Sequence, residues 1–224
     1  MLNMSKLILI RHGQSVYNEK NLFTGWANVD LTSKGINEAN DAAPLLKNIN
    51  FTHAFTSKLI RAQKTLDIIL DKLNQRLEVT ENIALNERDY GSLVGINKKD
   101  AAKKYGSEQV QIWRRSFSTP PPDGESLEMT ADRTLPFFKK FIKKLLLNDE
   151  NNIIISAHGN SIRAIVMYLH RLSSQEILNT EIGWCEPWIY EFENGFLKSF
   201  KIVPRPNDIS NSNLSTIPTT ISLI

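Results

Sequence analysis

The chain has 224 residues, of which 41% are hydrophobic and 23% charged, so it can bury one good core but is short for two. We therefore expect a single domain over residues 1–205. The formal net charge of +3 favours a small anionic ligand and argues against the strongly basic surface with which proteins usually bind nucleic acid.

The single cysteine, Cys185, excludes an intramolecular disulfide, and no Cys/His cluster has the spacing of zinc ligands. The sequence shows no secretory signal and no apolar run near the ~20 residues of a membrane-spanning helix. We expect a cytoplasmic protein with a metal-free site and with neither a membrane nor a nucleic-acid partner.

The first predicted element is a buried strand, because residues 7–10 form an apolar run. Arg11, His12 and Gly13 follow it, so the two side chains lie at the carboxyl end of the strand, where open α/β sheets bind their ligands. A neutral imidazole can attack phosphorus and hold the phosphoryl group, and a neighbouring guanidinium can bind two phosphoryl oxygens. A lone histidine after a strand is more often structural, so this interpretation needs support from the rest of the chain.

Helices and strands then alternate along the chain. Thr32 is a candidate cap for a helix over residues 32–47, residues 51–56 read as a strand, and residues 59–73 carry apolar side chains at helical spacing. Arg61 lies in the first turn of the second helix, where it can reach the same anion site. The alternation predicts an α/β fold with a mainly parallel sheet flanked by helices on both faces.

Residues 85–122 interrupt this alternation with glycines and prolines, and we expect short helices and loops over the carboxyl edge of the sheet. Residues 126–147 follow as a long helix with a kink at Pro136. Its basic stretch, residues 137–147, has apolar pairs every four residues, which favours an amphipathic helix packed on the core. A helix lying on a membrane surface is the alternative.

A second apolar run, residues 153–157, precedes His158 and Gly159 and repeats the arrangement around His12. The two histidines meet in one pocket if their strands are neighbours in a parallel sheet. Two final strands and a tail rich in Ser, Thr and Asn complete the chain: residues 188–192, 197–203 and 206–224. We expect the tail to be mobile or loosely docked.

Several stretches occur in an order typical of one group of enzymes: residues 11–15, 23–26, 31–35, 85–88, 113–116, 125–127 and 157–161. On these residues the chain resembles the histidine phosphatase superfamily and, within it, the cofactor-dependent phosphoglycerate mutases, over about residues 6–203. The resemblance implies a histidine-phosphatase-like α/β fold. It also implies interconversion of 3-phosphoglycerate and 2-phosphoglycerate in glycolysis and gluconeogenesis, primed by 2,3-bisphosphoglycerate and without a metal.

The resemblance makes His12 the phosphorylated nucleophile, while Arg11, Arg61 and His158 spread the charge of the transferring phosphoryl group. His158 would be cationic when phosphate is bound. Glu87 would pass a proton to or from the substrate hydroxyl, and bound phosphates would raise its pKa toward a useful value.

The resemblance also implies the substrate-binding residues, which combine cations for a distal anionic group with neutral donors: Asn18, Thr24, Gly25, Arg88, Tyr90, Lys98, Arg114, Arg115, Gly159 and Asn160. The ligands would be small phosphorylated three-carbon acids, and a homodimer is a candidate assembly. Three features depart from the family pattern. Asp89 adds a carboxylate, the loop between Pro122 and Glu125 is short, and residues 182–187 replace a shorter turn.

Two other functions stay open at this point. A histidine phosphatase would pass the phosphoryl group from His12 to water, and a noncatalytic phosphate-binding module would not turn over. Lys98, Arg114 and Arg115 favour the mutase over the phosphatase, because a distal clamp suits a substrate with two anionic groups. The presence of both a nucleophile and a proton donor, His12 and Glu87, argues against a binding module.

Overall fold

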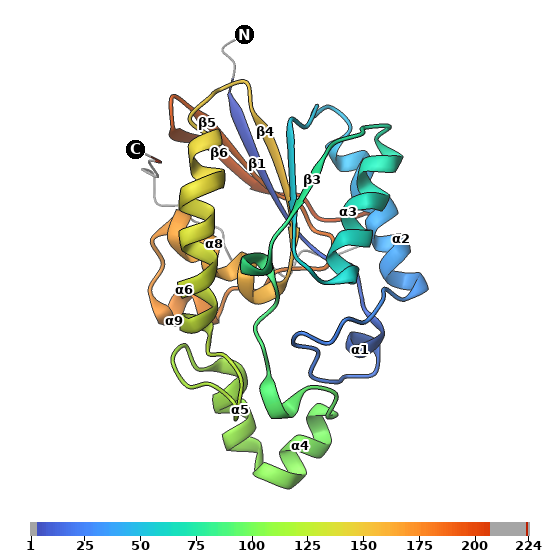
Figure 1. Cartoon of the computed structure of the whole chain (residues 1–224), viewed down its shortest axis with the longest axis vertical. Coiled ribbons are helices and arrows are strands. Elements are labelled where there is room, and N and C mark those ends of the chain that lie inside the picture. Colours follow the sequence, from blue (N-terminus) through green and yellow to red (C-terminus); the bar gives the residue numbers. More distant parts are fainter. Residues whose placement is uncertain (1–3, 207–222, 224) are drawn as a thin grey trace.

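The computed structural model describes residues 4–206 and 223, and within them one sheet holds six strands in the order β3-β2-β4-β1-β5-β6 (Figure 1). The strands are β1 (Ser5–Arg11), β2 (His53–Thr56), β3 (Val79–Glu81), β4 (Asn152–Ala157), β5 (Trp188–Glu193) and β6 (Phe196–Ile202). Strands β3, β2, β4 and β1 are parallel, whereas β5 is antiparallel to β1 and β6 to β5. The predicted α/β fold with a mainly parallel sheet is confirmed.

The helices include short 3-10 segments, labelled η, between the α-helices. In chain order they are α1 (Val16–Glu19), α2 (Ser33–Ala42), η1 (Ala43–Leu46), α3 (Ile60–Lys72), η2 (Ile83–Leu85), η3 (Gly91–Leu93), α4 (Lys98–Tyr105), α5 (Ser107–Arg115), α6 (Leu127–Phe137), the π-helical turn η4 (Phe138–Ile142), α7 (Lys143–Leu145), α8 (Gly159–His170) and α9 (Ser174–Leu178). Thr32 caps α2 as predicted, because its hydroxyl accepts a hydrogen bond from the Gly35 N–H at 3.1 Å.

Helices cover both faces of the sheet, with α2 and α3 on one side and α6 and α8 on the other (Figure 1). Successive side chains of a strand point to opposite faces, and β1 serves both cores in this way. Ile8 and Ile10 pack in the core beneath α2 and α3, whereas Leu7 and Leu9 pack in the core beneath α6 and α8. All four side chains are fully buried, so the strand that leads to Arg11 and His12 is packed on both of its faces.

The long helix predicted over residues 126–147 is interrupted. Pro136 lies in the last turn of α6, and η4 begins two residues later. A proline has no N–H for the helical ladder, which favours an irregular turn at this place. Phe138, Ile142 and Leu146 are fully buried while Lys139 and Lys140 are exposed, so this basic stretch packs on the core as predicted.

The predicted excursion over the carboxyl edge is confirmed, since α4 and α5 lie beyond that end of the sheet (Figure 1). They pack around a small core of their own that includes Phe23, Leu93, Ala101 and Val110. Strand β3 was not predicted, because its three residues are half-buried or exposed and carry no apolar pattern.

Of the tail predicted to be mobile, residues 206–224, all but Pro206 and Leu223 lie outside the described residues. Leu223 is buried in the core beneath α6 and α8, and its N–H donates to the Gly195 carbonyl at 2.8 Å. In the described part of the chain, every helix is too short or too polar to cross a membrane.

Candidate active site

The two strand-end histidines lie together. Strands β1 and β4 are parallel neighbours, and Arg11 is opposite Ala157 in their register. The residue after each strand is therefore brought to the same place, and the ring centroids of His12 and His158 are 4.9 Å apart. The meeting predicted from the repeated strand and His-Gly pattern is confirmed.

A close approach of two backbones holds the loop that follows His12. A side chain at Gly13 would place its Cβ 2.3 Å from the Gly35 carbonyl oxygen, so only glycine fits against the start of α2. The Gly13 N–H donates to the Thr65 hydroxyl on α3 at 3.1 Å. His12 is thus carried by a segment fixed to two helices.

Hydrogen bonding fixes which nitrogen of His12 can react. Nδ1 lies 2.6 Å from the Gly13 carbonyl oxygen, which can only accept, so Nδ1 carries the hydrogen. Nε2 keeps its lone pair and accepts from Nε of Arg61 at 3.3 Å. Burial, and then the charges of Arg61 and Arg11, lower the pKa of His12 well below its ordinary value. The imidazole is neutral at physiological pH, as a nucleophile must be.

Arg61, in the first turn of α3, is fully buried beside His12. Its two terminal nitrogens donate to the carbonyls of Ala27 and Gly25, each at 2.9 Å. Burial lowers the pKa of Arg61 to about 10, so it stays cationic at neutral pH. Gly25 contributes here by anchoring Arg61 through its carbonyl.

His158 is fully buried behind His12, and its Nε2 lies 2.7 Å from the hydroxyl of Ser57. Burial, followed by the charge of Arg61, lowers the pKa of His158 well below its ordinary value. Without a bound anion the ring is therefore neutral. Its cationic form in the presence of phosphate stays a prediction.

Glu87 is nearly fully buried and lies on the cavity wall. Its Oε1 accepts from the Arg88 N–H at 2.8 Å and from the side-chain amide of Asn160 at 2.9 Å. Burial by itself would raise the pKa of Glu87, but these hydrogen bonds and the charges of Arg11 and Arg61 outweigh it and lower the pKa. The group is a carboxylate, ready to accept a proton, when no ligand is bound.

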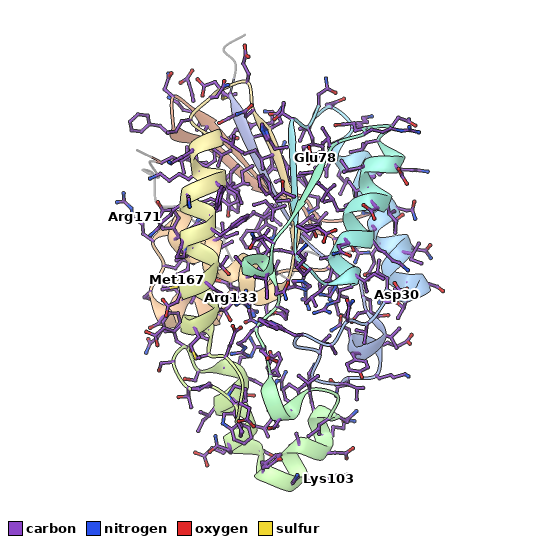
Figure 2. The ribbon with its side chains drawn as sticks, in the orientation of Figure 1. Asp30, Glu78, Lys103, Arg133, Met167 and Arg171 are labelled. Atoms are coloured by element: carbon purple, nitrogen blue, oxygen red, sulfur yellow. The ribbon has the colours of Figure 1, made fainter. Side chains whose placement is uncertain are left out.

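Arg133 of α6 holds the segment that carries Glu87, and sequence reasoning missed it. Its guanidinium donates to the carbonyls of Ala84, Asn86 and Glu87 at 3.0, 3.1 and 2.8 Å. It also binds both oxygens of Glu125, at 2.8 and 2.9 Å. Figure 2 shows Arg133 pointing toward the middle of the molecule. No local pattern marks this residue, because all its partners except Glu125 are distant in sequence.

The site residues surround a cavity of about 140 Å³. The predicted residues that line it are Arg11, His12, Asn18, Thr24, Arg61, Glu87, Tyr90, Lys98, Arg114, Arg115, Gly159 and Asn160. Four further lining residues were not predicted: Leu22, Phe23, Arg163 and Glu181. Arg163 follows Asn160 by three residues on α8, so helical spacing is a signal that could have identified it.

Gly25, Arg88 and His158 do not line the cavity. Arg88 is buried and donates to the Tyr90 hydroxyl at 2.8 Å, with its guanidinium carbon 4.7 Å from the centre of that ring. It therefore orients Tyr90 from behind. A direct substrate contact of Arg88 stays a prediction.

Two of the departures from the family pattern now have a structural account. Asp89 does not line the cavity, and its Oδ1 accepts from the Gly91 N–H at 3.0 Å. The longer turn supports Arg11, whose Nη1 donates to the Ile182 carbonyl at 2.9 Å and whose guanidinium lies 5.3 Å from the Trp184 ring centroid.

The charges of the cavity suit a polyanion such as 2,3-bisphosphoglycerate. Its lining carries the cations Arg11, Arg61, Lys98, Arg114, Arg115 and Arg163 against the carboxylates Glu87 and Glu181. Nε of Arg11 is buried without a hydrogen-bond partner among the described residues, so a donor is available for a ligand oxygen. No group of three or more His, Cys, Asp or Glu residues that could hold a metal ion occurs in the described ranges, and metal independence stays a prediction.

Comparisons with known proteins agree with this geometry. A family model described as the histidine phosphatase superfamily (branch 1) matches residues 7–201. The 2,3-bisphosphoglycerate-dependent phosphoglycerate mutase of Parvibaculum lavamentivorans is 51% identical, covering 84% of this chain and 90% of that protein. The enzyme of the same name from Nitrobacter hamburgensis is 53% identical, covering 82% and 90%.

Solved structures share the fold at lower identity. The phosphoglycerate mutase of Bacillus anthracis aligns with a TM-score of 0.72 at 21% identity, over 90% of this chain and 93% of that chain. The alpha-ribazole phosphatase of Shigella flexneri aligns with a TM-score of 0.77 at 22% identity, over 92% and 100%. Because a mutase and a phosphatase fit about equally well, the fold by itself does not choose between the two reactions.

Proposed function

The chain belongs to the histidine phosphatase superfamily, and we propose that it interconverts 3-phosphoglycerate and 2-phosphoglycerate, a step of glycolysis and gluconeogenesis. The observation that carries this proposal is that two groups of cations line one cavity. We assign Arg11 and Arg61 beside His12 to the transferring phosphoryl group, and Lys98, Arg114 and Arg115 to the second anionic group of the substrate. The names of relatives that match more than four fifths of the chain support the same reaction.

His12 is the group that carries phosphate in this proposal. When bound, 2,3-bisphosphoglycerate supplies the phosphoryl group that primes it. Nε2 forms the bond to phosphorus with its lone pair, while the Nδ1–H bond to the Gly13 carbonyl holds the reactive tautomer. Arg61 lies 3.3 Å from Nε2, so it is placed to bind an oxygen of the incoming group, and Arg11 adds a second positive charge.

Glu87 balances the protons. When phospho-His12 gives its phosphoryl group to the free hydroxyl of the substrate, the P–N bond breaks, a P–O bond forms, and the hydroxyl proton goes to the Glu87 carboxylate. When the other phosphoryl group returns to His12, the oxygen that it leaves takes the proton back. The lowered pKa keeps Glu87 deprotonated in the absence of ligand, as its starting role of proton acceptor requires. Direct roles for the remaining predicted site residues are part of this proposal.

A coupled assay with and without 2,3-bisphosphoglycerate tests the function. We expect conversion of 3-phosphoglycerate that rises with the primer, and an acid-labile, base-stable phosphoprotein after incubation with it. The variant His12→Gln should neither label nor turn over, whereas His53→Gln, at the far end of the sheet on β2, should do both. Release of inorganic phosphate without mutase turnover would identify a phosphatase instead.

The compartment and the assembly are also proposals. An enzyme that works on glycolytic intermediates is expected in the cytoplasm. Sedimentation analysis of the purified chain tests the candidate homodimer, and limited proteolysis tests the single domain over residues 1–205.

A further inference from the structure

Glu181 bridges two arginines on the wall of the cavity. Its Oε1 accepts from Nη1 of Arg115 at 2.8 Å, and its Oε2 accepts from Nη2 of Arg163 at 3.1 Å. The three residues come from different elements, since Arg115 ends α5, Arg163 lies in α8, and Glu181 lies in the turn after α9. Each carboxylate oxygen thus serves one guanidinium.

Glu181 is bound by the two arginines in the way that the distal anionic group of a phosphoglycerate would be bound. A carboxylate held by two guanidinium groups is a geometry that proteins use to bind anionic substrates. In the described structure the chain supplies that carboxylate itself. Without it, Arg163 would lie near Arg11 and Arg115 with little compensation, and like charges in a partly buried place repel. Glu181 therefore acts as an internal counterion.

The two carboxylates of the cavity differ in how easily they can leave. Glu87 is 8% exposed and accepts hydrogen bonds from the backbone and from Asn160, so it is fixed. The side chain of Glu181 is 46% exposed and has only its two arginine partners among the hydrogen bonds of the described residues. A half-exposed carboxylate is hydrated again when it turns outward. Moving Glu181 away from the two arginines therefore costs little free energy.

We propose that the distal anionic group of a phosphorylated hydroxy acid displaces Glu181, and that Arg163 then joins Arg115 as part of the clamp that holds this group. The proposal rests on the proposed function, because it concerns the second anionic end of the same substrate. Exchange of one carboxylate for another leaves both guanidinium groups paired before and after binding. The affinity for the substrate then depends on its second anionic group. A single phosphate bound at His12 has no second group that could replace Glu181 beside Arg163.

Calorimetric titration of the unphosphorylated chain with 3-phosphoglycerate and, separately, with inorganic phosphate tests this displacement. In Glu181→Gln, which keeps the size of the side chain but removes its charge, we expect 3-phosphoglycerate to bind about two- to fivefold more tightly. Binding of inorganic phosphate should stay unchanged. The control Glu81→Gln, on β3, removes the carboxylate of a surface ion pair with Lys58, and it should change neither affinity.

Three outcomes would overturn the displacement. Weaker binding of 3-phosphoglycerate in Glu181→Gln would mean that Glu181 positions the arginines for the substrate. Unchanged binding would show that Glu181 has no effect on substrate affinity. Equally tighter binding of both ligands would show that Glu181 acts only through the overall electrostatic potential of the cavity. Turnover of the wild-type chain, measured on the same preparation, reports on the proposed function separately, because the titrations need no catalysis.

A variant at Arg163 tests the other half of the proposal. Arg163→Gln should bind 3-phosphoglycerate roughly tenfold more weakly, the loss of one charge-assisted contact, and bind inorganic phosphate as the wild type does. A thermal melt identifies any misfolded preparation, and Arg163→Lys, which keeps the charge, then serves in its place with a smaller loss. If affinity for 3-phosphoglycerate is unchanged in the folded variant, Arg163 is not part of the clamp.

Discussion

The guanidinium of Arg61 donates to the very nitrogen of His12 that is left with a lone pair, at 3.3 Å. Burial keeps the imidazole neutral, and the charge of Arg61 adds to this effect because a cation beside the ring opposes protonation. A transferring phosphoryl group would place its oxygens where this donor already points. Arg61 and His12 are therefore held as one unit before any ligand binds.

The neutral histidines predict a loss of stability in acid. In the unfolded chain a histidine binds a proton near pH 6.5, whereas burial holds the pKa of His12 and His158 well below that value in the fold. The unfolded state then binds more protons, so the free energy of unfolding should fall as the pH drops below about 6.5. The slope should reach about 1.4 kcal/mol per pH unit for each histidine, and urea unfolding at pH 5 and pH 7 measures it.

The variant His12→Gln supplies the check on this acid effect. It should reduce the pH dependence by the contribution of one histidine. Equal slopes in the wild type and His12→Gln would show that the ring of His12 is protonated in the folded state.

Arg133→Lys should slow the reaction without weakening ligand binding. Lysine keeps the charge beside Glu125 but cannot reach the Ala84, Asn86 and Glu87 carbonyls at once. We expect kcat to fall by about tenfold or more through displacement of the Glu87 carboxylate, with the Kd for 3-phosphoglycerate within about twofold of the wild type. Coupled kinetics and calorimetry measure the two quantities.

Arg171→Lys is the matched control for this variant, because Arg171 points away from the molecule after α8 (Figure 2). It should leave kcat and Kd unchanged. An Arg133→Lys enzyme of wild-type kcat would show that Glu87 does not depend on this support.

The distal clamp predicts a change in the balance of two activities. Arg114 lines the cavity, and its replacement by alanine should lower mutase kcat/KM by about one to two powers of ten, the value of one charge-assisted contact. Formation of phospho-His12 should fall less. The ratio of bisphosphate hydrolysis to mutase turnover should therefore rise, because an intermediate held less firmly leaves the phosphohistidine open to water. Equal losses in both activities would remove Arg114 from the clamp.

Activity should persist in excess chelator and fall with vanadate, which can take up the trigonal-bipyramidal geometry of phosphoryl transfer. The expectation follows from a centre in which guanidinium groups supply the positive charge beside the two histidines. Assays before and after dialysis against chelator measure it. Activity lost on dialysis and restored by manganese would contradict this expectation.

The parts of the site that the sequence predicted are those with a local signal. The His-Gly pattern after two apolar runs was enough to bring His12 and His158 together, because parallel strands end at the same edge of a sheet. Arg133 and Glu181 were not predicted because most of their partners lie far away in sequence and no periodicity connects them. Strand β3 was not predicted for a different reason. It is stabilised mainly by pairing with β2, and its own residues carry no apolar pattern.

Leu223 docks beside the turn between β5 and β6, and Ser5 begins β1 at the same end of the sheet, opposite to His12. Figure 1 shows α4 and α5 at the other extreme. A surface attached to the protein at the turn between β5 and β6 would thus lie on the side opposite to the cavity, and the cavity would face the solution. Protein immobilised in this way should retain access to small ligands.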